Sequence, residues 1–193
     1  MTASPQFQPR RRQLVTLAGG WALAGPLAAV AAAEPPTGWV KPPLPAPALR
    51  ITGADGRKRA LPALLAGKVT AVQLMFTGCS ATCPIQGALF AAVAGRLRST
   101  DVQLLSISID VLGDTPPMLA AWQAQFGRHP AWNAALPEVA DVDRLADFMK
   151  GVTGRPGTHT AQVFVFDRAA RLCYRTGDSP AIAEVEALLA RVA

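Results

Sequence analysis

The 193-residue sequence contains only three cysteines and two histidines, while half of its residues are apolar. Three cysteines are too few for a disulfide scaffold, which excludes a small fold held together by covalent cross-links. The apolar content and the 17% of charged residues exclude wholesale disorder and predict one packed domain. No internal repeat is visible.

Acidic residues are absent from positions 1–33, where three arginines lie together as Arg10-Arg11-Arg12. The net charge of the whole chain is +6, but removal of this segment leaves 16 basic against 13 acidic residues. The remaining basic residues are scattered, apart from Arg57-Lys58-Arg59 beside a predicted turn, where a solvated hairpin edge is expected. The sequence therefore carries no signature of nucleic-acid binding.

Residues 1–33 have the pattern of a secretory signal peptide. The arginines precede a moderately apolar stretch, residues 14–30, and a small-residue cleavage site, Ala31-Ala32-Ala33. The paired arginines resemble a twin-arginine leader. Glycines and a proline dilute the apolar stretch, which disfavours a permanent anchor because a stable span needs about 20 strongly apolar residues. An ordinary leader and an uncleaved anchor remain alternatives. All three place the domain outside the cytoplasm, and we expect it in the periplasm.

The rest of the chain is expected to contain a linker and one α/β domain. Residues 34–47 include six prolines and predict an extended, polyproline-like linker. Within residues 48–193 we expect a hairpin over 49–61, buried strands at 69–76 and 102–109, a second hairpin over 161–175, and helices that begin near residues 83, 116, 141 and 180. This order is that of a thioredoxin-like fold, a central mixed β-sheet flanked by helices.

Cys79 and Cys83 lie where the buried strand at 69–76 passes into a helix, at the sheet edge where open α/β sheets place their chemistry. The partial positive charge of a helix N-terminus favours thiolate over thiol. Two sulfurs one helical turn apart can converge on one ion or form a disulfide. Soft sulfur ligands favour Cu(I), although such a pair can also bind zinc. The spacing is one residue longer than in the CxxC of redox thioredoxins.

His159 immediately precedes the first strand of the second hairpin, which places it opposite the cysteine loop in the expected fold. Its imidazole can then complete a site with Cys79 and Cys83, and such a site tolerates both Cu(I) and Cu(II). The other histidine, His129, lies in a predicted exposed loop and is expected to be inert. Cys173 is expected to pack on an edge strand.

Four stretches of the sequence together resemble the Sco/SenC family, a thioredoxin-like group that delivers copper to the CuA centre of cytochrome c oxidase. They are residues 76–84 (FTGCSATCP), residues 106–116 (SISID followed by DTP), His159 and Asp167. The resemblance implies that Cys79, Cys83 and His159 are the copper ligands, and that Asp110 and Asp114 order a loop. A turn and a helix start are the alternative roles of these two aspartates.

The sequence departs from the family pattern at three positions. Ser80 and Val111 stand where the family usually has proline, and Thr158 stands where an aspartate usually precedes the histidine. The resemblance therefore implies a divergent member that binds one copper ion per chain, as Cu(I) or Cu(II), and passes it to an oxidase subunit or another copper acceptor. A membrane contact is expected only through an uncleaved leader.

A second function remains open, that of an enzyme. The same pair, Cys79 and Cys83, would serve a thiol–disulfide oxidoreductase or a peroxidase, which would need a periplasmic thiol–disulfide reductant as its partner. His159 separates the two hypotheses, because a purely redox protein needs no imidazole there and usually has a proline before that strand. The sequence therefore favours the copper carrier over the enzyme.

Overall fold

The computed structural model describes residues 35–150 and 159–193. The predicted leader and Thr158 lie outside the described residues. The elements are β1 (Gly38–Pro45), β2 (Arg50–Gly53), β3 (Lys58–Ala60), α1 (Leu61–Leu65), β4 (Val69–Met75), α2 (Thr82–Arg96), β5 (Val102–Ser108), α3 (Pro116–Ala124), β6 (Trp132–Pro137), a 3-10 turn (Val139–Asp141), α4 (Val142–Met149), β7 (Val163–Phe166), β8 (Arg171–Arg175) and α5 (Ile182–Val192). No helix among the described residues is both long and apolar enough to cross a membrane.

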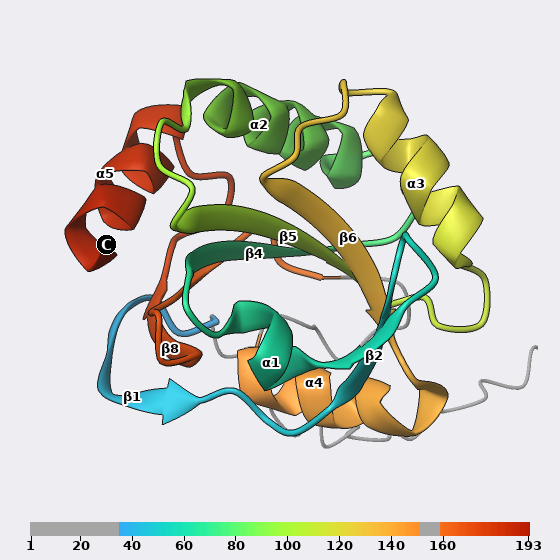
Figure 1. Cartoon of the computed structure of the whole chain (residues 1–193), viewed down its shortest axis with the longest axis horizontal. Coiled ribbons are helices and arrows are strands. Elements are labelled where there is room, and N and C mark those ends of the chain that lie inside the picture. Colours follow the sequence, from blue (N-terminus) through green and yellow to red (C-terminus); the bar gives the residue numbers. More distant parts are fainter. Residues whose placement is uncertain (1–34, 151–158) are drawn as a thin grey trace, which may run out of the picture. The chain divides into compact units, whose positions relative to one another are not determined.

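One mixed sheet organises the described residues, with strand order β1-β8-β7-β4-β5-β6-β2-β3. The pairs β4–β5 and β5–β6 are parallel, and the remaining neighbours are antiparallel. Helices α2, α3 and α5 lie on one face of the sheet, and α1 and α4 lie on the other (Figure 1). The prediction of a thioredoxin-like α/β fold with a mixed sheet between helices is confirmed.

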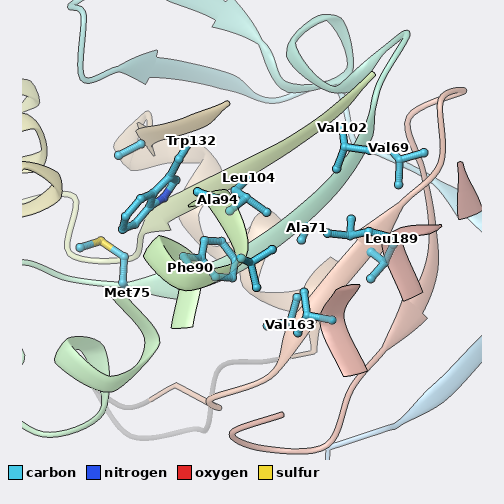
Figure 2. Packing of buried hydrophobic residues seen from close by; sticks show 14 of the residues in the cluster. Val69, Ala71, Met75, Phe90, Ala94, Val102, Leu104, Trp132, Val163 and Leu189 are labelled. Atoms are coloured by element: carbon cyan, nitrogen blue, oxygen red, sulfur yellow. The ribbon is translucent and has the colours of Figure 1, made fainter. Parts of the chain in front are cut away.

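The strands β4 and β5 are buried along their whole length, because both faces of the sheet are covered there. Alternate β4 side chains point to opposite faces, with Ala71 in one apolar cluster and Val72 in the other. On the α2 side, Phe90 packs edge-on against Trp132 with ring centroids 6.0 Å apart. Figure 2 shows this packing around Phe90 and Trp132, with Met75 beside them.

The structure corrects the prediction that residues 34–47 form a linker. Gly38–Pro45 is the edge strand β1, which pairs with β8 in antiparallel register from Gly38↔Arg175 to Pro45↔Arg171. Prolines suit an edge strand, because the N–H groups that they lack would face solvent there. Apolar side chains also hold β1 in place: the ring of Trp39 lies 5.1 Å from that of Tyr174, and the Arg191 guanidinium lies 4.6 Å from the Trp39 ring.

Two further elements were not predicted from the sequence. The short helix α1 begins directly after β3, with Pro62 in its first turn, where a missing N–H has no helical partner to lose. The strand β6 extends the sheet beyond β5 in parallel register, with Leu104 opposite Trp132. On its other side, β6 pairs with β2 in antiparallel register. The predicted hairpin of β2 and β3 is therefore part of the main sheet.

The packing of β1 predicts that Trp39→Ala lowers the free energy of unfolding by about 1–2 kcal/mol, because an aromatic pair and a cation–π contact are lost. Equilibrium urea unfolding of the purified protein measures this difference. If residues 34–47 were a free linker, the substitution would leave the unfolding midpoint unchanged.

Candidate metal centre

The cysteine loop connects the end of β4 to α2 at the carboxyl edge of the sheet. The helix begins at Thr82, earlier than predicted, so that Pro84 is its third residue. Pro84 is still tolerated there, since the first four N–H groups of a helix have no partner within the helix. The backbone N–H of Cys83 donates to the Cys79 sulfur at 3.4 Å. The Cys79 sulfur thus receives a hydrogen bond from the start of α2.

The pair of sulfurs and the imidazole of His159 converge at this edge. The ligand atoms of Cys79, Cys83 and His159 all lie within 4.8 Å of one another. The Cys83 sulfur is 3.4 Å from Nε2 of His159. Residues 76 positions apart in the sequence meet because β7, which follows His159, pairs with β4, which precedes the cysteines. The structure therefore brings together all three residues that the sequence predicted.

The orientation of His159 leaves one ring nitrogen free for a ligand or a proton. Its Nδ1 lies 2.9 Å from the carbonyl oxygen of Thr160, which can only accept, so Nδ1 carries the hydrogen and donates. In the neutral ring, Nε2 then has its lone pair directed towards the Cys83 sulfur, 3.4 Å away. The ring also packs edge-on against Phe76, at a centroid distance of 5.9 Å.

Buried hydrogen bonds hold the strand segment that carries His159. The Thr160 hydroxyl donates to the Gln162 side-chain oxygen at 3.1 Å, and the Gln162 amide donates to the Thr176 carbonyl at 2.7 Å. The same amide group reaches the Pro36 carbonyl at 3.2 Å. The side chains of Thr160, Gln162 and Thr176 are at least nine-tenths buried. Their hydrogen bonds therefore hold the backbone next to His159 in place.

The two cysteines differ in exposure and in acidity. Cys83 is fully buried, whereas Cys79 is partly exposed. Burial, followed by the hydrogen bond to Cys79, raises the pKa of the Cys83 thiol to about 12. Burial also raises the pKa of Cys79, but hydrogen bonds from the Cys83 thiol and from the backbone N–H groups of Cys83, Ala81 and Thr82 outweigh it. The net result is a Cys79 pKa below its ordinary value.

The pKa of His159 lies below its ordinary value, because burial disfavours the charged ring. The hydrogen bond with Thr160 and the negative charge of Asp178 oppose this shift without reversing it. Sequence reasoning missed Asp178, which follows β8. The antiparallel pairing of β7 with β8 places the end of β8 beside the start of β7, which the sequence order alone did not reveal.

Asp114 does more than precede the start of α3, because its carboxylate connects two loops at the site. Its buried carboxylate accepts hydrogen bonds from the Thr77 backbone N–H at 3.0 Å, the Thr77 hydroxyl and the Ser108 hydroxyl at 2.6 Å. It therefore ties the loop after β5 to the beginning of the cysteine loop. Asp110 instead closes its own turn by accepting from the Gly113 N–H at 2.9 Å. The sequence signal for Asp114 was its place in the stretch that resembles the Sco/SenC family.

The other cysteine and histidine lie apart from this site. Cys173 is buried as expected and donates to the Val165 carbonyl at 3.1 Å, but its strand β8 is an inner strand between β1 and β7. The half-buried His129 accepts from the Ala131 N–H through Nδ1 and lines a different cavity, of about 460 Å³, beside α3 and β6. Residues Phe76, Gly78, Cys79, Ser80, Ala81, Thr82 and His159 line a second pocket, of about 350 Å³, at the cysteine loop.

Comparisons with known proteins identify the fold and the family of the chain. No curated protein sequence matches the chain. The crystal structure of a SCO1/SenC family lipoprotein from Bacillus anthracis str. Ames is 23% identical and has a TM-score of 0.66, covering 79% of this chain and 98% of its own. Bradyrhizobium japonicum ScoI with copper bound is 21% identical with a TM-score of 0.61, and the coverage is 78% and 99%.

A third structure, of BsSco, is described as showing a disulfide switch in a member of the Sco family of cytochrome c oxidase assembly proteins. It is 16% identical, with a TM-score of 0.67, and covers 78% of this chain and 94% of its own. These structures share the fold. The SCO1/SenC family model matches residues 50–193, which include the whole cysteine loop and His159. The chain therefore belongs to the SCO1/SenC family.

Proposed function

We propose that this protein is an exported copper carrier that binds one copper ion through Cys79, Cys83 and His159 and delivers it to the CuA site of cytochrome c oxidase in the periplasm. The observation that carries the proposal is the convergence of two sulfurs and one imidazole nitrogen within 4.8 Å of one another. A movement of about 1 Å per side chain brings such a set to bonding distance of a common ion, since metal–sulfur bonds are about 2.3 Å long.

The donor set suits copper in both oxidation states. Two soft thiolates favour Cu(I), and the harder imidazole nitrogen supports Cu(II). The hydrogen bond from Nδ1 to the Thr160 carbonyl leaves Nε2 as the ligating atom and fixes the plane of the ring. Because the pKa of His159 is lowered, its Nε2 carries no proton at neutral pH. Copper therefore competes with few protons for this nitrogen, even under mildly acidic conditions.

Copper binding must displace the proton of Cys83. The pKa of this thiol is about 12, so it is protonated at neutral pH, and a metal ion binds to the thiolate. Copper affinity is therefore expected to rise with pH across the neutral range. Cys79 is the ligand that an acceptor can reach, because it is partly exposed while Cys83 is fully buried. Exchange with an acceptor would then begin at Cys79.

The oxidase as destination is supported by the family and by two of its members. Copper is bound to Bradyrhizobium japonicum ScoI, and BsSco belongs to the cytochrome c oxidase assembly proteins. Export to the periplasm is supported by the leader pattern of residues 1–33, with its arginines and its small-residue cleavage site. A thiol–disulfide reductant in the same compartment would keep the two cysteines reduced for copper binding.

The unequal acidity of the two thiols also supports a second function, thiol–disulfide exchange. The Cys79 thiolate would attack a substrate disulfide, form a mixed disulfide and release one substrate thiolate. Cys83, after losing its proton, would attack the Cys79 sulfur, release the second substrate thiolate and leave a Cys79–Cys83 disulfide. Two electrons pass to the substrate, and a dithiol reductant would restore the pair. A peroxidase would begin with the same attack, on a peroxide oxygen.

The copper proposal predicts that the reduced protein binds one equivalent of Cu(I) or Cu(II) and that His159→Ala weakens Cu(II) binding by at least about 100-fold. Loss of a ligand is expected to exceed the 10–100-fold effect typical of a group that only supports a ligand. Cu(I) affinity should fall less, because both sulfurs remain. Competition titrations with chelators of known affinity measure both constants.

The matched control for this titration is His129→Ala, which removes the other histidine far from the sulfurs and should leave both affinities unchanged. Cys173→Ser should likewise preserve the stoichiometry. If His159→Ala leaves both affinities unchanged while the wild-type protein reduces insulin disulfides rapidly, the oxidoreductase is the correct function.

The unequal thiols predict that iodoacetamide at pH 7.5 alkylates Cys79 at least ~100-fold faster than Cys83, since the thiolate is the reactive form. The Cys79 rate should rise with pH and level off below the ordinary thiol pKa, because its folded pKa is lowered. Quenched labelling followed by peptide mass mapping measures each site. Cys173, with a pKa raised to about 11 by burial, is the internal control for a slow thiol. Equal labelling of all three would contradict the assignment.

A further inference from the structure

Among the described residues, charged side chains are almost absent from the α2–α3 side of the candidate metal centre, whereas the exposed Asp178, whose charge acts on His159, follows β8 on the other side of β4. The sequence has no Asp, Glu, Lys or Arg between residues 69 and 95, and only Asp114 between residues 111 and 127. Asp114 is buried, so it contributes no surface charge. These two stretches contain the whole of α3 and all of α2 except its last residue, Arg96. The two helices cover the same face of the sheet (Figure 1).

The other long helices have the usual charged outer side. Helix α4 exposes Asp143, Arg144 and Asp147, and α5 exposes Glu184 and Arg191. On α2 and α3, by contrast, the exposed positions hold proline, isoleucine, alanine, glycine and methionine, and Arg96 at the end of α2 is the one exposed charged residue. The absence of charge is therefore a property of the α2–α3 side and not of the protein's helices in general.

Three large apolar side chains stand out from this uncharged surface. The exposed fraction is 64% for Ile85, 86% for Leu112 and 43% for Met118. Ile85 lies in the first turn of α2, two residues after Cys83, and Met118 lies in the first turn of α3. Since β4 and β5 run parallel with Met75 opposite Ser108, the loops after both strands leave the sheet at the same edge. All three residues therefore belong to the edge that carries Cys79.

Leu112 is held in its exposed position by a closed turn. The Asp114 N–H donates to the Asp110 carbonyl at 2.9 Å, and the Gly113 N–H donates to the Asp110 carboxylate at 2.9 Å. The Asp114 carboxylate then ties this turn to Thr77, two residues before Cys79. Solvent-exposed apolar groups that gather on one side of a soluble protein indicate an interaction site. Leu112 is thus an exposed apolar side chain on a turn that is hydrogen-bonded to the start of the cysteine loop.

A protein that exchanges copper with Cys79 must cover this surface. Its ligating atom has to approach to bonding distance of an ion held at Cys79, about 2.3 Å for sulfur. A specific protein–protein interface covers about 800 Å² on each partner, which corresponds to a disc with a radius of roughly 16 Å. A disc of that size around Cys79 takes in the first turns of both α2 and α3. On the α2–α3 side of Cys79, the partner therefore meets an apolar surface without exposed charges among the described residues.

We propose that Ile85, Leu112 and Met118, on the uncharged α2–α3 surface, form the docking surface for the protein that exchanges copper with Cys79. That partner presents an apolar, uncharged surface around its own copper-ligating side chains. The inference rests on the proposed copper-carrier function. Recognition then depends on burial of apolar area rather than on charge pairing, so salt has little effect on the exchange rate. Asp110, which is exposed and closes the turn that carries Leu112, is the nearest charged residue in the sequence before this surface.

The test compares copper transfer to a protein with copper transfer to a small molecule. The Cu(I)-loaded protein is mixed in a stopped-flow instrument with a soluble CuA fragment of the oxidase subunit from the same organism, or with the chelator bicinchoninate. The variants are Leu112→Asp and Met118→Asp. The control is Val139→Asp, which places the same charge on an equally conspicuous apolar residue, 60% exposed in the 3-10 turn before α4.

We expect each variant of the docking surface to transfer copper to the CuA fragment at least ~10-fold more slowly, because a charge is buried without a partner at the interface. Transfer to bicinchoninate, copper affinity and the Val139→Asp rates should match the wild type. Raising NaCl from 0.05 to 0.5 M should change the wild-type rate less than about twofold.

The outcomes separate the docking surface from the proposed function. Equal transfer rates to the CuA fragment in all four proteins would overturn the docking surface and leave the copper carrier intact. Failure of the wild-type protein to transfer copper to the fragment, despite tight binding, would also overturn it. Failure of the wild-type protein to bind copper would instead overturn the proposed function.

Discussion

The pairing of β4 with a different neighbour on each side is the constraint on which the site depends. On one side β7 pairs with β4 from Gln73↔Val163 onwards and brings His159 to the cysteine loop. On the other side β5 runs parallel to β4 and brings Asp114 to Thr77. One buried strand thus collects an imidazole, a supporting carboxylate and two sulfurs from three distant parts of the chain. A one-residue slip in either pairing would turn the neighbouring side chains to the opposite face.

The site divides its chemistry between a buried part and an accessible part. Cys83 is held in the first turn of α2, and His159 is held by its hydrogen bond to the Thr160 carbonyl. The Cys83 sulfur and Nε2 of His159 face each other. Cys79 sits nearer to solvent, and the backbone N–H groups at the start of α2 stabilise its thiolate. The same asymmetry suits both stepwise ligand exchange and disulfide exchange, which explains why the two functions share one pair of residues.

Much of this arrangement was predictable from the sequence, and the rest depends on tertiary contacts. The run of apolar residues at 69–76 followed by Cys79 and Cys83 located the sheet edge, and the position of His159 before a strand located the imidazole. For Asp114 only the family resemblance implied a loop-ordering role, and Asp178 was missed, because the contacts of both residues depend on strand neighbours rather than on sequence spacing. The strand β1 was missed because its prolines are typical of a linker, and only the open edge of β8 gives them a place in a sheet.

The hydrogen bond between Gln162 and the Pro36 carbonyl has a practical consequence for fragment design. The stretch ahead of β2 looks dispensable, and the family match itself begins only at residue 50. A shortened version starting there would lose both β1 and the Pro36 carbonyl, one of the two acceptors of the Gln162 amide, which lies three residues from His159. Versions intended for crystallisation or metal studies should therefore start ahead of Pro36, so that the backbone behind His159 keeps its support.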